Sequence, residues 1–230
     1  MRGPIGLPRA CMTQRTIWMS ISKASIINTG GKALTVFEIM VAKTYDEAKG
    51  FDLAERYGAL RDGSDEDRES LTGAKFETIP ESIVMQCVAA ITLRAVRSRD
   101  ILKIRRETFI EKWGPMKAAL FTAVDFIRSE LRVPVSQLVP SPAVLVALTY
   151  FFHTTGNRKP SNDQVRRLEQ FFYWVGLTER YSAATESKLS EDFTRMDAIT
   201  KGDTPNYPST ELSVDAKRIE ETWFSAGNAY

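Results

Sequence analysis

The stretch "SPAVLVALTYFFHTTG", Ser141 to Gly156, decides the fold class of this chain. Ser141 and Pro142 form an N-cap and first-turn pair, and Gly156 supplies a helix stop. Between them apolar side chains recur at helical spacing: Val144, Leu145, Leu148, Phe151 and Phe152. Its most apolar part, "AVLVALTYFF" from Ala143 to Phe152, is far shorter than the roughly 20 residues that cross a bilayer. The stretch therefore predicts a buried helix, and no membrane is expected as a partner of this protein.

The segments on either side of this run repeat the helical pattern. Ser161 with Gln164 forms a capping box, and a later helix is predicted to end at Gly202. Upstream, Pro80 opens one helix, and Gly114-Pro115 is predicted to break the chain before another. The apolar faces of the four helices are Ile83, Val84, Cys87, Val88 and Ile91; Leu120, Phe121, Val124, Ile127 and Leu131; Val165, Leu168, Phe172 and Val175; and Leu189, Phe193, Met196 and Ile199.

Helical signals also occur nearer the two ends. Thr35 and Glu38 form a second capping box, for a helix that is predicted to run to about Ala48. A short helix is expected over 51–60 and a last one from about Ser213. Strand-like composition is confined to the short stretches "TIWMSI" and "AKFETI". The predicted fold is all-α, an irregular multi-helix bundle of about seven or eight helices with little or no β structure near the N-terminus.

Composition narrows the functional class. The chain has 230 residues, of which 43% are hydrophobic, and 31 Lys and Arg residues nearly balance 29 Asp and Glu residues. This balance argues against a polybasic nucleic-acid arm or an acidic tail, although it leaves room for a local patch. Cys87 lies in an apolar run and is interpreted as a small buried hydrophobe. With no signal-peptide pattern at the start, these features favour a soluble, cytoplasmic protein.

Familiar catalytic and metal motifs are not found in the sequence. His153 is the single histidine, and it is interpreted as a partner of a helix C-terminus rather than as a catalyst or ligand. No metal-ligand spacing occurs, so no metal is expected. The stretch Gly30-Gly31-Lys32 lacks the upstream glycine and the downstream Ser or Thr of a Walker motif. No catalytic residue can be named from these patterns.

A basic run, "RAVRSRDILKIRRE", is the better candidate for binding. It contains Arg94, Arg97, Arg99, Lys103, Arg105 and Arg106. If the run is one helix, Arg99, Lys103 and Arg106 share a face, where each can meet a phosphate of double-stranded DNA. The alternative is a solvated helix face that acids elsewhere in the fold balance.

Two further segments have competing interpretations. The aromatic set over 171–182 is a base-stacking platform or, at its helical spacing, core, and core is favoured. Arg180 and Tyr181, just beyond it, either pin a helix–helix corner or reach a ligand. The loop Asn28-Thr29-Gly30-Gly31 can expose backbone amides to a phosphate, or it is an ordinary turn before a capped helix.

The residues of that loop carry a resemblance. "INTGGKALTVFEIMVAKTYD", 27–46, resembles a segment of the GmrSD-type, modification-dependent restriction endonucleases. The matching residues are Ile27, Asn28, Thr29, Gly30, Gly31, Leu34, Thr35 and Glu38. "FFYWVGLTERYSAATESKLSEDFTRM" is similar to a second stretch of that family, with Arg180, Tyr181, Ser182 and Asp192 in the matching places. The resemblance covers roughly residues 27–199.

The resemblance implies a function in bacterial restriction and phage defence. Such proteins join a ParB/sulfiredoxin-like nucleotide hydrolase to a helical region, often followed by an HNH-type nuclease. The family's Asp-Gly-Gln-Gln-Arg motif, which carries hydrolysis, is absent from these 230 residues. The resemblance therefore divides the chain into four segments. Residues 1–26 are not family-derived, and residues 27–60 border the missing hydrolase domain. Residues 61–78 form a charged linker, and residues 79–230 form a helical domain.

Three functional hypotheses follow. The first is a partial GmrSD-like protein that keeps one edge of a nucleotide site and no complete active site. Its nucleotide-binding residues are Asn28, Thr29, Gly30 and Gly31. An NTP is implied for a complete protein but not for this chain alone, and the implied partner is the missing hydrolase half or a nuclease subunit. The second is a non-enzymatic helical module that binds DNA or protein through the basic run. The third is a helical fragment whose exposed apolar surface makes it oligomerise.

Overall fold

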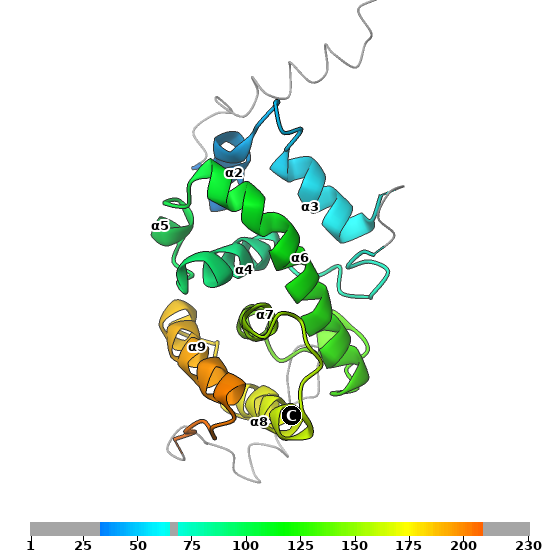
Figure 1. Ribbon diagram of the computed structural model, residues 1–230, viewed down its shortest axis with the longest axis vertical. Coiled ribbons are helices and arrows are strands. Elements are labelled where there is room, and N and C mark those ends of the chain that lie inside the picture. Colours follow the sequence, from blue (N-terminus) through cyan, green and yellow to red (C-terminus); the bar gives the residue numbers. More distant parts are fainter. Residues whose placement is uncertain (1–32, 65–68, 209–230) are drawn as a thin grey trace, which may run out of the picture.

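The computed structural model describes residues 33–64 and 69–208, and in these ranges it confirms the all-α prediction. It contains eight α-helices and a short 3-10 helix there, without a β-strand (Figure 1). The elements are α2 Val36–Thr44, α3 Leu53–Asp62, α4 Glu81–Leu93, α5 Ser98–Ile101, α6 Arg106–Ser129, η1 Ser136–Leu138, α7 Val144–Thr154, α8 Asn162–Leu177 and α9 Thr185–Lys201. The stretch 16–21, with its strand-like composition, and the helix predicted from Ser213 lie outside the described residues.

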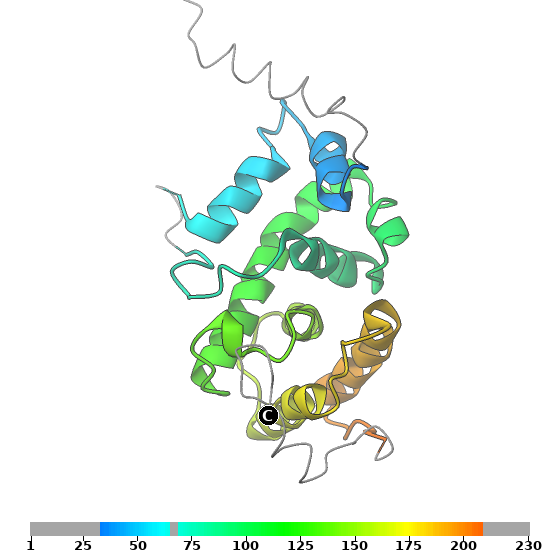
Figure 2. The ribbon, with the colours of Figure 1, turned by 180° about the vertical axis from the view of Figure 1, so that it is seen from behind.

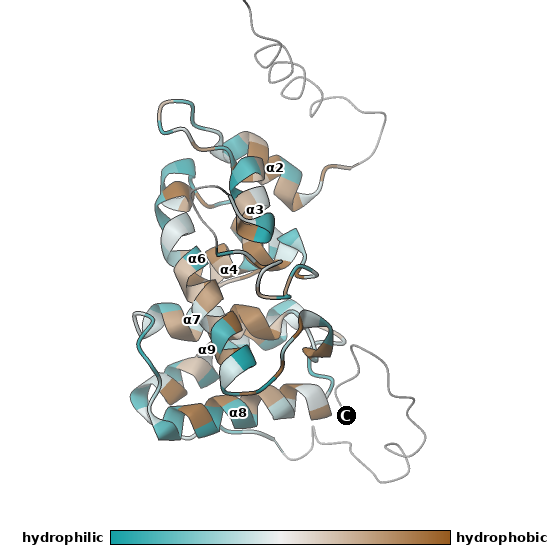
Figure 3. Ribbon diagram, turned by 90° about the vertical axis from the view of Figure 1, so that its right-hand side faces the viewer, coloured by the Kyte–Doolittle hydropathy of each residue, from teal (hydrophilic) through white to brown (hydrophobic). Residues whose placement is uncertain are grey.

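Helix α7 is the centre of the core. It packs against α4, α6 and α9, and eight of its side chains are buried: Val144, Leu145, Val146, Ala147, Leu148, Thr149, Phe151 and Phe152. Most of its ribbon is coloured as hydrophobic in Figure 3. A helix that is apolar on nearly every side is stable in water only when neighbours cover it all round. The run that decides the fold class therefore also organises the packing.

The other helices lie at two ends of an elongated body. Helices α2 and α3 lie at one end and α8 and α9 at the other, as the front and back views agree (Figures 1 and 2). Helix α6 has 24 residues, spans about 36 Å at 1.5 Å per residue, and contacts α2 as well as α7. None of the helices in the described ranges has both the length and the hydropathy needed to span a bilayer.

A single hydrophobic cluster joins the two ends. It begins at Met40 in α2 and extends to Ile199 in α9. It also takes in the segment before α4, where Leu71 and Phe76 are completely buried. The stretch "AKFETI" is thus a turn that inserts apolar side chains into the core rather than a strand.

The helix ends follow the capping predictions. The box at Thr35 and Glu38 forms, with the Thr35 amide donating to Glu38 Oε2 at 2.7 Å and the Glu38 amide to Thr35 Oγ1 at 3.2 Å. A second complete box forms at Ser161 and Gln164. Gly202 ends α9 at φ +86°, in the left-handed region that glycine adopts without steric cost. These local devices confirm both predicted boxes and the predicted end of α9.

The predicted break at Gly114-Pro115 is wrong. Helix α6 continues through Pro115 for its full 24 residues. Proline removes one backbone donor and normally ends a helix. Here Trp113 before it and Met116 after it are both buried, so packing on the core holds the helix together across the proline. Tertiary burial has overridden a local signal.

Two helix boundaries also differ from the sequence prediction. Helix α2 ends at Thr44 rather than near Ala48, because the chain turns there and Asp46 and Phe51 exchange two backbone hydrogen bonds of 3.0 and 2.9 Å. Helix α7 starts at Val144, two residues after the expected first-turn proline. Ser141 does cap a turn at that point, since its hydroxyl accepts from the Ala143 amide at 3.3 Å.

Candidate functional site

The basic run lies between α4 and α6, where the structure breaks it into three short pieces. Arg94 is the C-cap of α4 at φ +53°, four residues form α5, and Arg105 is the N-cap of α6. The basic run is therefore not one continuous helix, as the predicted DNA-binding face required, and Arg99, Lys103 and Arg106 do not share a helix face. The cause is burial: Val96, Ile101 and Ile104 are anchored in the core, and the chain must turn to place them there.

All six cations of the run are exposed, but two of them, Arg94 and Arg106, are paired with acids on other elements. Arg94 donates to Asp197 Oδ2 at 2.6 Å and to Thr194 Oγ1 at 3.0 Å, both on α9. Tyr150 donates to the other oxygen of Asp197 at 2.8 Å. Because Asp197 binds two partners, Arg94 joins α4 to α9 and is poorly placed to meet a ligand.

Arg106 is the second cation with an acidic neighbour on another element. Its Nε lies 3.7 Å from Asp46 Oδ2 and 3.4 Å from Glu107 Oε1. Asp46 is only 11% exposed, so this contact is partly shielded from solvent. Arg106 therefore fastens the start of α6 to the turn after α2, although its own side chain stays half exposed.

The remaining four cations surround α5. Arg99 and Lys103 flank a single acid, Asp100, at 3.9 and 3.5 Å, and their side chains are 68% and 72% exposed. Arg97 and Arg105 have no acid within ion-pair distance among the described residues. Four exposed cations sharing one acid make a small surface of net positive charge, which is called the α5 basic edge below.

A second group of predicted residues lies in the core at the other end of the molecule. Arg180 is 1% exposed and Asp192 is completely buried. The Arg180 Nε donates to both oxygens of Asp192, at 3.0 and 2.9 Å, and the Tyr181 hydroxyl donates to Asp192 Oδ2 at 2.7 Å. Arg195 donates to Asp192 Oδ1 at 2.8 Å from the next turn of α9. One carboxylate thus collects two guanidiniums and a phenol.

The electrostatics of this buried cluster agree with its geometry. Burial disfavours the charged guanidinium of Arg180, but its bonds to Asp192 outweigh burial, so the pKa of Arg180 is raised. Burial, together with the charge of Asp192, raises the pKa of Tyr181 well above its ordinary value. At neutral pH Arg180 therefore keeps its charge and the Tyr181 phenol keeps its proton. Neither group is available for proton transfer.

Trp174 completes the cluster from α8. The guanidinium carbons of Arg180 and Arg195 lie 4.5 and 4.7 Å from its ring centroid, and the Tyr207 ring lies 4.9 Å away. Stacking of guanidiniums on an aromatic face adds to the ion pairs. Together these contacts tie α8, the turn that follows it and α9 into one corner. Of the two predicted roles for Arg180 and Tyr181, the geometry supports a structural one at the corner between α8 and α9 rather than contact with a ligand.

The other predicted features are structural or lie outside the described ranges. Asn28, Thr29, Gly30 and Gly31 fall among the residues that are not described. The remaining aromatic residues of the predicted platform are mostly core, with Phe171, Phe172 and Trp174 buried and Tyr173 52% exposed. Cys87 is completely buried, as predicted.

No group of metal-ligating side chains occurs in the part of the chain that the structure describes. The half-buried His153 has a lowered pKa, first because of burial and then because of the charge of Lys112. No acid contributes to that shift. The imidazole is therefore neutral at neutral pH, and it lacks the carboxylate partner that orients a catalytic histidine.

Sequence reasoning missed two members of these sites. Arg195 was detectable, because it lies three residues after Asp192 on a predicted helix, a spacing at which charged side chains meet. Asp197 was not, because its partner Arg94 lies 103 residues earlier. Local spacing carries no information about a pair at that separation.

The fold and these sites define a class: an all-α bundle with a buried ion-pair corner and an exposed basic edge. No family model, curated protein or solved structure matches the chain. The arguments about function therefore depend on this chain's own residues.

Proposed function

We propose that the chain is the helical portion of a GmrSD-type restriction and phage-defence protein, without a complete active site of its own. The supporting observation is where the residues of the resemblance lie. Arg180, Tyr181 and Asp192 bind one another in the core, and Thr35 and Glu38 cap α2 reciprocally. The box at Thr35 and Glu38 follows from local spacing, so the support comes from Arg180, Tyr181 and Asp192, which lie on two elements and bind one another in the core.

The role of these residues in the proposed protein is to hold the fold, not to catalyse. Asp192 is completely buried and Arg180 is 1% exposed, so a substrate cannot reach either group. Because the Asp-Gly-Gln-Gln-Arg motif is absent from the 230 residues, we expect no NTP turnover by the purified chain. Incubation with each common NTP, with release of phosphate measured, checks this. Turnover that co-purifies with the chain through successive columns would contradict the proposal.

The genomic context gives the direct test of the proposed origin. We expect several hundred bases upstream of the gene, translated in every frame, to encode an Asp-Gly-Gln-Gln-Arg motif. A motif in another frame that joins near Ile27 supports a fragment of one hydrolase. A motif in a complete neighbouring gene supports a two-protein system. If neither is present, the proposed origin fails.

We also propose that the α5 basic edge binds the phosphate backbone of double-stranded DNA. The supporting observation is that Arg97, Arg99, Lys103 and Arg105 are exposed around one short helix and share a single acid. Because phosphate contacts release counterions, each adds about 0.9 to the slope of log affinity against log salt. Contacts of this kind carry no sequence preference, so affinity should be similar for unrelated duplexes.

A charge-matched comparison tests the DNA proposal. Four substitutions to alanine at Arg97, Arg99, Lys103 and Arg105 should lower the salt slope by up to about 3.6 and weaken binding. The control removes the same charge away from the edge, by substitution of Arg128, Arg158, Lys159 and Arg166, all exposed. The control should retain most of the slope. Equal loss in both variants, or no binding by the wild-type chain, would refute the proposal.

A further inference from the structure

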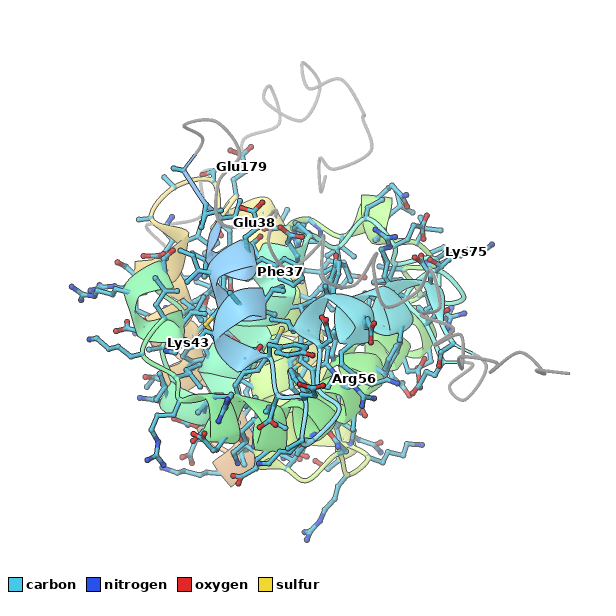
Figure 4. The ribbon with its side chains drawn as sticks, turned by 90° about the horizontal axis from the view of Figure 1, so that it is seen from above. Phe37, Glu38, Lys43, Arg56, Lys75 and Glu179 are labelled. Carbon is cyan, nitrogen blue, oxygen red and sulfur yellow. The ribbon has the colours of Figure 1, made fainter. Side chains whose placement is uncertain are left out.

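A groove opens at the α2 end of the molecule, with α5 on one side of it and the buried Arg180 corner at the other end of the molecule. Its volume is about 560 Å³, and it lies between α2, α3, the segment before α4 and α5. Its lining includes Ile79, Met85 and Ile101, whose side chains are almost completely buried. Phe37 of α2 and Tyr57 of α3 form one wall, in edge-on contact at 5.3 Å between ring centroids. In Figure 4, Phe37 lies on the side of α2 that faces α3, and Lys43 lies on the opposite side.

The groove holds an unsatisfied acceptor. The Oε1 atom of Gln86 is buried, and no described residue donates a hydrogen bond to it. Nearby, the Tyr57 hydroxyl donates to the Ile79 carbonyl at a long 3.4 Å. A buried acceptor without a donor is costly. Gln86 is only partly buried and lines the groove, so a turn of its side chain would present Oε1 to an occupant that brings a backbone N–H along with apolar side chains.

The charged residues that line the groove select a basic occupant. Glu77 and Glu81 line it, and the one cation beside them, Arg61, is already bound to Asp62 at 2.7 Å. Burial raises the pKa of Tyr57, the charge of Glu81 raises it further, and the charge of Arg61 opposes both. The side of the groove formed by Glu77 and Glu81 thus suits a positively charged group, whereas Arg97 and Arg99 lie next to Ser98 on its α5 side. An occupant that is apolar at its centre and places its cations toward Glu77 and Glu81 fits both sides.

The chain itself contains such a segment next to the groove. Residues 1–32 contain five cations, Arg2, Arg9, Arg15, Lys23 and Lys32, and no Asp or Glu. Within them, 16–21 reads Thr-Ile-Trp-Met-Ser-Ile and is flanked by Arg15 and Lys23. Thr35 is itself part of the groove lining. The connection from Ile21 to Thr35 reaches up to about 45 Å when extended, which is ample for a site at its own end.

We propose that residues 16–21 of this chain bind in the groove. Ile17, Trp18 and Ile21 cover the apolar lining, and a backbone amide of the segment donates to Gln86 Oε1. Arg15 and Lys23 face the carboxylates of Glu77 and Glu81. A short tether gives such a segment an effective concentration on the order of millimolar, so modest contacts are enough to keep it bound. This proposal goes beyond the proposed function and depends on neither the family origin nor the DNA contacts.

Fluorine NMR on the full chain, labelled with 5-fluorotryptophan, tests the binding. The sequence contains four tryptophans, and substitution W18F assigns the signal of Trp18. We expect the Trp18 signal to be shielded from a soluble paramagnetic probe at least five-fold better than in a free peptide of residues 9–23. Equal accessibility in chain and peptide would refute the proposal.

Charge reversal supplies the specificity control. The variant E77K/E81K should expose Trp18 to the probe, and adding R15E/K23E in the same chain should restore shielding. The control variant E130K/E169K changes the same charge elsewhere and should leave Trp18 shielded. If reversal at Glu77 and Glu81 changes nothing, the segment is bound elsewhere and the proposal fails.

Dilution separates the proposed occupant from a second copy of the chain. Binding within one chain is independent of concentration, whereas binding between two copies weakens on dilution. We expect constant shielding from high to low micromolar protein and a monomer mass by light scattering. Shielding that fades in step with a dimer mass would assign the groove to a second copy and overturn the intramolecular proposal. Neither outcome affects the DNA-binding slope or the genomic test.

Discussion

Replacing Asp192 by asparagine is predicted to destabilise the fold strongly. The carboxylate accepts from Arg180, at 3.0 and 2.9 Å, from Arg195 at 2.8 Å and from the Tyr181 hydroxyl at 2.7 Å. An amide of the same shape keeps part of this network but leaves two guanidiniums without their shared counter-charge. Removing one partner of a buried ion pair costs about 3–5 kcal/mol. In a chain of this size that corresponds to a melting temperature roughly 6–20 °C lower.

Urea unfolding of the full chain, followed by helical circular dichroism, measures this loss. The control is Glu191→Gln, which removes a contact to the same Arg180 from a side chain that is 58% exposed, and it should cost less than about 1 kcal/mol. Replacing both partners, in Arg180→Met with Asp192→Leu, should recover part of the loss because the buried guanidinium of Arg180 is removed together with its counter-charge, while Arg195 keeps Glu191 at 3.6 Å. If Asp192→Asn lowers the free energy of unfolding by under about 1 kcal/mol, the buried ion pair does not hold α8 and α9 together.

Three further outcomes are expected. Thr35→Ala and Ser161→Ala should each cost about 0.5–2 kcal/mol in urea unfolding, because each removes an N-cap; no change would contradict the capping boxes. Burial raises the pKa of Cys87 to about 12, so its thiol should resist alkylation at pH 8 in the folded chain and react in urea, with peptide mapping as the readout. The pKa of His153 is lowered in the fold by burial and Lys112, so the unfolded chain binds more protons. Stability should therefore fall as pH drops below about 6.5, and His153→Gln should flatten that part of the profile.

The sequence predicted most of the helices because their signals are local. Capping residues and apolar stripes both act within a few residues, so the boxes at Thr35 and Ser161 and the buried face from Leu120 to Leu131 were found correctly. Pro115 was misread for the same reason. A local rule says that proline ends a helix, whereas the burial of Trp113 and Met116 that holds α6 together is a property of the assembled core.

The candidate sites were predicted in composition but not in arrangement. Every residue of the basic run was identified from the sequence. The sequence did not show that Arg94 binds α9 while the other cations stay exposed around α5, because this depends on where Val96 and Ile101 are buried. The Arg180 corner needed Asp192 from the next helix and Trp174 from the preceding one. Those contacts follow from how helices pack, and spacing along one element does not encode them.

The pairing of Arg94 with Asp197 has a consequence for how the chain folds as it is made. The two residues are 103 positions apart, and Asp197 belongs to the last helix that the structure describes. At synthesis rates of about 5–20 residues per second, Arg94 at the end of α4 emerges about 5–20 s before its partner Asp197 in α9. In the later part of that interval α7 has been made, and its apolar face lacks α9, against which it packs in the folded chain. Those seconds are when a nascent chain of this protein should bind a chaperone most strongly, and the arrival of α9 should release it.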